Sequence, residues 1–241
     1  TGREGTSHIF IAGETMRAIF GYKTLGVFQN QEQIESMPHV DGAEPGDLIF
    51  ADISGPDGVP DGVINKDDRT ILGNGVPDAI FGFNLVTSWK GIDLAILIQG
   101  VVGNEILLAN SNVGGGRSFF DVPENLVAER ADRWHGEGTS TTQPRLYWGG
   151  SPNNNNRNSD FFVEDGSYVR VKNLQIGYTF PLRWTEKAYI NKLRVYVGGT
   201  NLWTLTNYSG FDPEIAMEQS DSYGFNYPMP KTFIIGLNLG F

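Results

Sequence analysis

The chain has 241 residues, a formal net charge of −10 and no cysteine. The negative charge argues against a nucleic-acid-binding function, because the phosphate backbone attracts basic surfaces. The missing cysteines exclude a disulfide framework and thiolate chemistry. No apolar run approaches the roughly 18 residues that a membrane-spanning helix needs, whereas 31 glycines and 12% aromatic residues favour strands and turns.

The first third of the chain predicts little regular structure. Two strand-like runs occupy residues 8–12 and 18–28, and a short helix is predicted at 31–36. Clusters of Gly, Pro and Asp then extend to residue 75 and predict a surface loop. The sequence opens on Thr1 without a signal peptide, so we expect a processed product or a piece of a longer protein.

Strong strand patterns begin at residue 80. Strands over 80–90 and 92–108 are separated by Lys90-Gly91 alone, which predicts an antiparallel hairpin. A helix is predicted from Glu124 to Trp134 within the long excursion that follows.

Three further strands are predicted at 167–180, 193–205 and 232–241. In the strand 167–180, Tyr168 is expected on the same side as Leu174, Ile176, Tyr178 and Phe180. The last strand has one continuously apolar face, formed by Phe233, Ile235, Leu237, Leu239 and Phe241, and a second face of mostly small or polar residues.

This alternation fits two architectures, a soluble β-sandwich and a transmembrane β-barrel. Ten residues are enough for a tilted strand to cross a bilayer. The connections alternate between short turns and long excursions, as they do in outer-membrane barrels, which favours the barrel. We therefore expect an all-β fold in which residues 1–241 form part of one transmembrane antiparallel β-barrel, with long extracellular loops at 29–79 and 110–160.

Several segments together resemble the SusC/RagA family, the TonB-dependent outer-membrane transporters of the Bacteroidota. They occur in family order along nearly the whole chain and are, in order, 20–24 (FGYKT), 26–30 (GVFQN), Gly46-Asp47, 67–73 (DDRTILG), Arg133-Trp134, 162–173 (FVEDGSYVRVKN), 201–203 (NLW) and 210–214 (GFDPE).

The resemblance implies the C-terminal portion of a 22-stranded TonB-dependent receptor barrel in the outer membrane of a Gram-negative bacterium. It implies active import of an oligosaccharide, glycan or peptide, with a SusD-like lipoprotein as partner and energy supplied by TonB through a plug domain. The plug and the earlier strands are absent here, so the rest of the barrel is expected as a separate chain or a missing segment. The alternative is a soluble, surface-exposed, β-rich carbohydrate-binding or adhesin module.

One segment has the spacing of a calcium loop. In a twelve-residue register starting at Asp57, Asp61 takes position 5, the Val63 carbonyl position 7 and Asp68 position 12. Val59 breaks the pattern at position 3, and Asp52 is a candidate for the missing ligand. The alternative is an Asp-Gly turn in which the carboxylates accept hydrogen bonds from their own backbone.

The sequence contains no catalytic motif, and we expect a protein that is not an enzyme. Aromatic and amide side chains in the long loops are candidates for substrate binding, with packing within the loops as the alternative. These candidates are Phe119, Phe120, Trp134, Tyr147, Trp148, Asn154, Tyr208 and Phe211.

Two further roles are predicted for apolar residues near the short turns. Trp89, Trp184 and Tyr189 fit an aromatic girdle at the periplasmic interface. The resemblance implies that the apolar positions of the last strand, ending at Phe241, form an assembly signal. Replacing Phe241 with Ala is therefore expected to lower the amount of assembled barrel.

Overall fold

A computed structural model describes residues 8–16, 18–55, 57–108, 131–146, 155–214 and 228–241. The chain divides into two compact units, each of which is built from separate stretches of sequence. Unit 1 comprises residues 1–76, 105–164 and 216–226, and unit 2 comprises residues 77–104, 165–215 and 227–241. Within the described residues, no helix has both the length and the apolar character needed to cross a membrane.

The described residues of unit 1 form three small antiparallel sheets and one short α-helix. The first sheet has the order β1-β2-β5, and the other two are the pairs β3-β4 and β8-β9. The elements are β1 (His8–Ile9), β2 (Ala18–Tyr22), β3 (Thr24–Val27), α1 (Gln31–Ser36), β4 (Leu48–Phe50), η1 (Lys66–Asp68), β5 (Arg69–Gly73), β8 (Glu105–Leu107), η3 (Asp160–Phe162) and β9 (Val163–Asp165).

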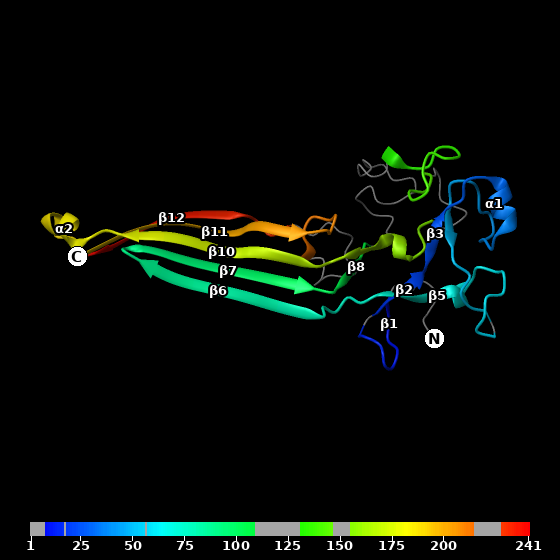
Figure 1. The fold of residues 1–241 in the computed structure, drawn as a ribbon, viewed down its shortest axis with the longest axis horizontal. Coiled ribbons are helices and arrows are strands. Elements are labelled where there is room, and N and C mark those ends of the chain that lie inside the picture. The colour runs from blue at the N-terminus through cyan, green and yellow to red at the C-terminus, as the bar shows by residue number, and fades with distance from the viewer. Residues whose placement is uncertain (1–7, 17, 56, 109–130, 147–154, 215–227) are drawn as a thin grey trace. The chain divides into compact units, whose positions relative to one another are not determined.

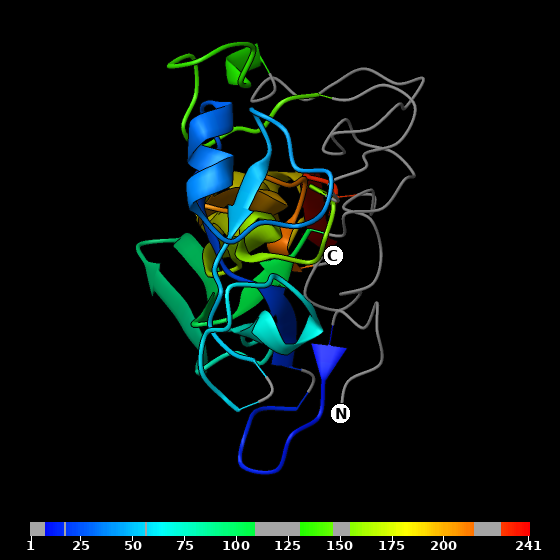
Figure 2. The same ribbon diagram turned by 90° about the vertical axis from the view of Figure 1, so that its right-hand side faces the viewer.

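The helix α1, the blue coil in Figure 2, begins where the sequence places its cap. The Asn30 side chain accepts a hydrogen bond from the Gln33 backbone N–H at 3.0 Å, which satisfies one of the free amides at the helix start. Ile34 is the buried residue of this helix and packs with Phe28 and Ile49. The predicted helix at 31–36 is therefore confirmed.

The segment 29–75 is more ordered than its composition predicts. Leu48, Ile49 and Phe50 form β4 and are buried, and Phe50 belongs to a core cluster with Tyr22 and Ile64. The expectation of a surface loop is wrong for these residues. A three-residue strand between Asp, Pro and Gly is too short to give a periodic signal, although burying it stabilises the unit.

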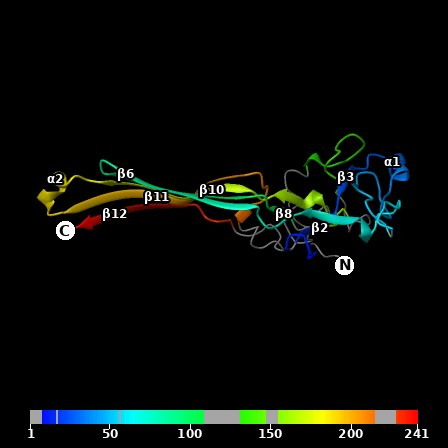
Figure 3. The ribbon, with the colours of Figure 1, turned by 60° about the horizontal axis from the view of Figure 1, so that its bottom comes forward.

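Unit 2 is a five-stranded antiparallel sheet with the order β12-β11-β10-β7-β6 (Figure 1). Its strands are β6 (Ala79–Trp89), β7 (Ile92–Val102), β10 (Tyr168–Thr179), β11 (Lys192–Thr206) and β12 (Thr232–Gly240), and the connection between β10 and β11 holds α2 (Leu182–Thr185) and η4 (Glu186–Ala188). Figure 3 shows β12 beside β11, where Lys192 lies opposite Gly240 and Thr200 opposite Thr232.

The turn between β6 and β7 has the predicted length of two residues. Lys90 and Gly91 both adopt positive φ, at 49° and 86°, and Trp89 lies opposite Ile92 in the ladder. Positive φ at both central positions is the signature of the type I′ turn, whose twist matches that of the strands it joins. The hairpin is confirmed.

The sheet has one apolar and one polar face. Residues directly opposite each other on antiparallel strands point to the same side of a sheet, so the pairing register assigns every position to a face. The apolar face carries, strand by strand, Phe81, Phe83, Leu85, Trp89; Ile92, Leu94, Ile96, Ile98; Val169, Val171, Leu174, Ile176, Tyr178; Val195, Val197, Trp203, Leu205; and Phe233, Ile235, Leu237, Leu239.

A β-bulge at Lys172 keeps the apolar face continuous along β10. Val171 lies opposite Ile98 and Asn173 opposite Leu97, so Lys172 is an extra residue on its strand. The bulge reverses the alternation, and Tyr168 consequently lies on the opposite face from Leu174. The expectation that these two residues share a side is wrong, because a simple two-residue period does not include the inserted residue.

In unit 1, the run expected at 8–12 is the two-residue strand β1, and the run expected at 18–28 is two strands, β2 and β3, in different sheets. Most strand predictions for unit 2 agree closely with the structure. The strands expected at 80–90, 167–180, 193–205 and 232–241 differ from the observed ones by one residue or so at each end. The strand expected at 92–108 is instead two strands, β7 and β8, separated by Gly103 with φ +83°. Most of the helix predicted at 124–134 lies outside the described residues, as does much of the predicted loop 110–160.

Candidate functional site

The apolar face of the five-stranded sheet is exposed. Phe233 and Ile235 on β12 retain 77% and 83% of their accessible surface, and the apolar residues of β6 are exposed along the whole strand. Exposed apolar patches of this extent on a water-soluble monomer are unusual, because each buried methylene gains roughly 0.8 kcal/mol. This face requires an apolar environment.

The polar face of the same sheet carries an ion pair that spans three strands. Arg194 on β11 donates from Nε to Asp93 Oδ1 on β7 at 2.9 Å, and its guanidinium also lies 3.3 Å from Gln175 Oε1 on β10. Gly177 lies between them in the ladder, where a Cβ atom would come within 2.6 Å of Arg194 Nη2. The glycine thus leaves room for the side chain of Arg194 to cross the middle strand.

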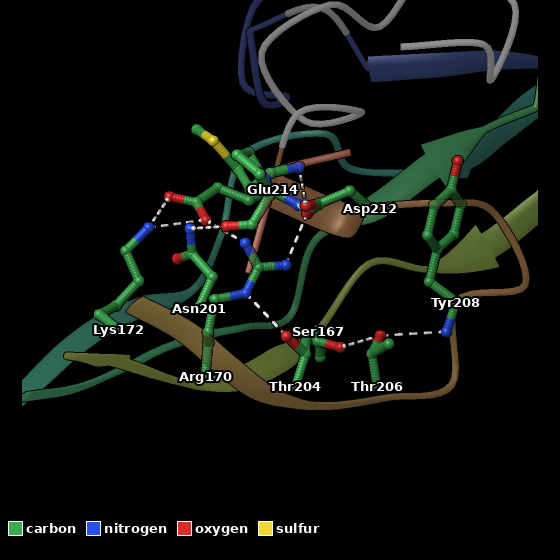
Figure 4. A network of polar contacts seen from close by, with 11 residues as sticks. Ser167, Arg170, Lys172, Asn201, Thr204, Thr206, Tyr208, Asp212 and Glu214 are labelled. Carbon is green, nitrogen blue, oxygen red and sulfur yellow. Dashed lines mark hydrogen bonds and ion pairs between the residues drawn. The ribbon is translucent and has the colours of Figure 1, made fainter. Parts of the chain in front are cut away.

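A second polar network lies where β10 meets the end of β11 (Figure 4). Arg170 is buried and donates to three acceptors from two segments: Thr204 Oγ1 at 2.8 Å, Asp212 Oδ1 at 2.7 Å and Glu214 Oε2 at 2.7 Å. The bulged residue Lys172 donates to Glu214 Oε1 at 2.7 Å. Two cations and two carboxylates therefore neutralise one another, which offsets the cost of burying them.

Asp212 binds both ends, or stems, of the chain segment between β11 and β12: one stem contains Glu214 and the other Met229. Its Oδ1 accepts from the Glu214 N–H and its Oδ2 from the Met229 N–H, each at 3.0 Å. Burial on its own would raise the pKa of the Asp212 carboxyl, but the hydrogen bonds from Arg170 and the two backbone amides together hold that pKa below its ordinary value. The carboxylate is therefore ionised wherever the sheet is folded at neutral pH.

The same segment contains two of the predicted substrate-binding residues, which differ in accessibility. The Tyr208 side chain is 6% exposed and covers Gly210, where a Cβ would lie 2.3 Å from the ring. Phe211 is 69% exposed. Only Phe211 of this pair presents a free aromatic face, while Tyr208 is held as a packing residue.

Trp134, a predicted substrate-binding residue of unit 1, packs within that unit. Its ring lies against Gly46, where a Cβ would meet Cε3 at 2.3 Å, and it contacts the core cluster that contains Phe50. Beside it, Arg145 donates from Nε to the buried carboxylate of Asp47 at 2.7 Å. The other predicted substrate-binding residues, Phe119, Phe120, Tyr147, Trp148 and Asn154, lie outside the described residues.

The carboxylates of the Asp-rich loop bond to backbone amides of the loop itself. Asp68 is fully buried and accepts from the N–H groups of Ile53, Ser54 and Asn65, at 2.9, 3.2 and 2.7 Å. Asp52 accepts from the Gly62 N–H at 2.7 Å, ten residues further along the loop.

The remaining carboxylate candidates give no closed ligand set. Asp61 accepts from the Val63 N–H at 3.0 Å, and Asp57 is exposed. Among the described residues, no three His, Cys, Asp or Glu side chains are grouped closely enough to hold a metal ion. Calcium binding by this loop stays a prediction that calorimetric titration can decide.

Sequence reasoning missed the residues that form the two polar networks. Asp93 and Arg194 lie 101 positions apart, and no local pattern links them. Asp212 and Glu214 lie in the segment 210–214, which the sequence already singled out. Their partner Arg170 is identified only by the pairing of β10 with β11.

No protein-family model matches the chain. The chain is 33% identical to TonB-dependent receptor P3 of Formosa agariphila, over 98% of its own length and 23% of that receptor. It is 22% identical to the TonB-dependent receptor SusC of Bacteroides thetaiotaomicron, over 90% of its length and 20% of SusC. A solved structure of the RagAB peptide transporter aligns with 98% of the chain at a TM-score of 0.70 and 23% identity, and the chain covers 24% of that structure. The chain thus spans about a quarter of the proteins it matches.

Proposed function

The chain belongs to the SusC/RagA family of TonB-dependent receptors, and from this premise we propose that it forms part of the wall of a barrel that imports a nutrient across the outer membrane. The exposed apolar face would contact the lipid and the polar face would line the interior. The observation that carries this proposal is the division of one five-stranded sheet into two such faces. The relatives are outer-membrane receptors and transporters, so the chain is not an enzyme and its location is the outer membrane of a Gram-negative bacterium.

The strands at the two edges of the sheet support a role within a larger barrel. Among the described residues, β6 pairs only with β7 and β12 only with β11. Unpaired backbone groups in hydrocarbon each cost several kcal/mol, so a membrane-spanning sheet has to close on itself. We therefore expect further strands of the same receptor to pair with both edges.

The substrate and partners belong to the proposal. We propose a glycan, oligosaccharide or peptide as the cargo, a SusD-like lipoprotein as the surface partner, and TonB as the energy source, acting through a plug outside this chain. RagAB is described as a peptide importer. The exposed ring of Phe211 is the described residue best suited to stack on such a cargo, because aromatic faces bind sugar rings and apolar peptide side chains alike.

A soluble binding module is disfavoured by the same exposed face. A soluble sandwich buries its apolar side under a second sheet about 10 Å away, whereas Phe83, Phe233 and Ile235 on the apolar side of this sheet are exposed. The assembly role of the apolar positions of β12 stays a prediction.

Two measurements on the full-length protein test the proposed function. The protein should be recovered in the outer-membrane fraction, and its band on a detergent gel should shift on heating, because a closed barrel resists unfolding by detergent at room temperature. A detergent-free, monodisperse monomer whose band does not shift would refute the proposal.

A further inference from the structure

One end of the five-stranded sheet is basic, although the chain as a whole is acidic. This turn end comprises the turn between β6 and β7, the connection between β10 and β11, and the last residues of β12. It carries four exposed basic residues, Lys90, Arg183, Lys187 and Lys192, and one exposed acidic residue, Glu186. Within the described part of the chain, none of the four basic side chains forms an ion pair.

Backbone hydrogen bonds hold these segments together as one rim. The Thr179 N–H donates to the Gly91 carbonyl at 2.7 Å, and the Asn191 N–H donates to the Gly240 carbonyl at 2.8 Å. Neighbouring strands are about 4.8 Å apart, so the basic groups follow one another along the rim at spacings comparable to a Debye length of about 8 Å. Their positive potentials add. The nearby Asp93 and Arg194 neutralise each other.

The rim also carries exposed aromatic residues next to the basic ones. Trp89, Trp184 and Tyr189 are all exposed. The Lys90 ammonium lies 4.6 Å from the centre of the Trp89 ring, and the Arg183 guanidinium lies 5.9 Å from that of Trp184. Trp and Tyr rings prefer the boundary between hydrocarbon and headgroups, and Lys and Arg stems extend from that depth to place their charges in water.

We propose that this turn end binds the anionic headgroups of phospholipids in the leaflet that surrounds it. The inference rests on the proposed function, because it requires the apolar face to be embedded in a bilayer. The rim continues directly from that face through Trp89, which lies opposite Ile92 on it. Ammonium and guanidinium groups form strong, charge-assisted hydrogen bonds with phosphate. A zwitterionic headgroup carries its own cation and gains less from them.

Competition between two lipids tests this inference. The full-length receptor is purified in detergent and incubated with equal amounts of phosphatidylglycerol and phosphatidylcholine, and the retained lipids are counted by native mass spectrometry. One basic residue near an anionic surface changes affinity by roughly fivefold. The wild type should therefore retain at least about five times more phosphatidylglycerol than phosphatidylcholine. The preference should disappear in 1 M salt, where the Debye length is about 3 Å.

Two variants show whether the lipid preference depends on the basic residues of this rim or on exposed basic residues anywhere on the chain. The variant K90Q/R183Q/K187Q/K192Q should bind the two lipids equally. The control K23Q/K66Q/K231Q removes exposed basic residues outside the rim and should keep the wild-type preference.

The inference is overturned if the wild type binds both lipids equally, if the rim variant keeps the preference, or if millimolar inorganic phosphate abolishes it. The last outcome would indicate a site for free phosphate. Membrane fractionation of the same samples shows whether only the lipid-binding inference fails or the proposed function fails as well. A wild type absent from the outer membrane refutes the import barrel, whereas a membrane-resident wild type without lipid preference refutes only the lipid-binding rim.

Discussion

Asp212 illustrates how a single buried carboxylate can organise a connection. It pairs with Arg170 on β10, and its two oxygens accept the backbone amides of Glu214 and Met229 on opposite stems of the segment between β11 and β12. Removing one partner of a buried ion pair leaves the other charge uncompensated. The loss of folding free energy is therefore larger than for a surface ion pair. Glu214, which also pairs with Arg170, limits the damage.

We predict that Asp212→Asn loosens both stems at neutral pH. The local free energy of opening should fall by about 2–4 kcal/mol, which corresponds to amide exchange at residues 214 and 229 that is faster by roughly thirtyfold or more. Hydrogen–deuterium exchange followed by mass spectrometry measures this effect. Lys172→Gln is the matched control and should have a smaller effect, because Lys172 is more exposed and, among the described residues, forms its ion pair with Glu214 alone.

The pH dependence of this difference follows from the lowered pKa of Asp212. A carboxyl whose pKa is lower in the folded state stabilises that state fully above its unfolded pKa, near 4, and loses the stabilisation as the pH falls through the folded value. The difference between wild type and Asp212→Asn should therefore be complete from about pH 5 upward and should shrink progressively as the pH falls below about 4. A difference that stays constant down to pH 2 would contradict this account.

For single residues, the amino-acid type predicted the chemistry of a side chain better than it predicted which groups the side chain contacts. Tyr208 and Trp134 were expected in a binding surface because they are aromatic, yet each covers a glycine inside its own unit. Asp68 was predicted as a metal ligand from its position in a calcium-loop register; its oxygens accept hydrogen bonds from three backbone amides, and metal binding there stays a prediction. Which role a side chain takes depends on neighbours that are remote in the sequence.

At the scale of elements, the Lys172 bulge decides which residues of β10 face which side. The strands themselves were predictable because their apolar positions alternate and their turns are short. The reversal was not predictable, because an inserted residue has no signature of its own in a pattern of alternation. Without the bulge, Arg170 would point to the apolar face instead of its carboxylates.

Deleting Lys172 should therefore impair assembly. The deletion turns Arg170 to the lipid face, where a cation near the end of a strand costs about 1 kcal/mol or less. It also removes Arg170 from Asp212 and Glu214, and leaving a buried charge unpaired costs about 3–5 kcal/mol. The fraction of heat-modifiable protein in the outer membrane should fall severalfold. Lys172→Ala keeps the bulge and should assemble nearly normally. Equal assembly of the deletion and the wild type would show that the bulge does not set the face.

The two faces of β12 give a second test at this scale. Leu237 lies on the apolar face and its neighbour Asn238 on the polar face. Leu237→Arg should cost about 2–4 kcal/mol in a bilayer and lower the amount of assembled receptor, whereas Asn238→Arg should be tolerated far better. The comparison uses the same substituent at adjacent positions. Similar losses for both variants would argue against a lipid-facing side.

For the whole molecule, the sequence predicted the all-β fold and the membrane-type sheet of unit 2, but not the compactness of unit 1. The strands of unit 2 could be predicted because each of them has about ten residues with a regular two-residue period. The individual strands of unit 1 could not be predicted, because they have two to five residues. The core residues of unit 1 also come from distant segments, such as Tyr22, Leu48 and Ile64. Short strands that are stabilised by non-local packing carry no periodic signal.

The accessibility of each residue of β12 in the reconstituted full-length receptor shows whether the sheet of unit 2 is embedded in a membrane. The chain contains no cysteine, so spin labels can be attached to cysteines introduced singly at positions 232–240. Collision with lipid-soluble oxygen should peak at 233, 235, 237 and 239, and collision with a water-soluble nickel complex should be lowest at these same positions. A profile without this two-residue period, or one in which the nickel complex reaches 235 and 237 freely, would contradict a membrane-embedded sheet.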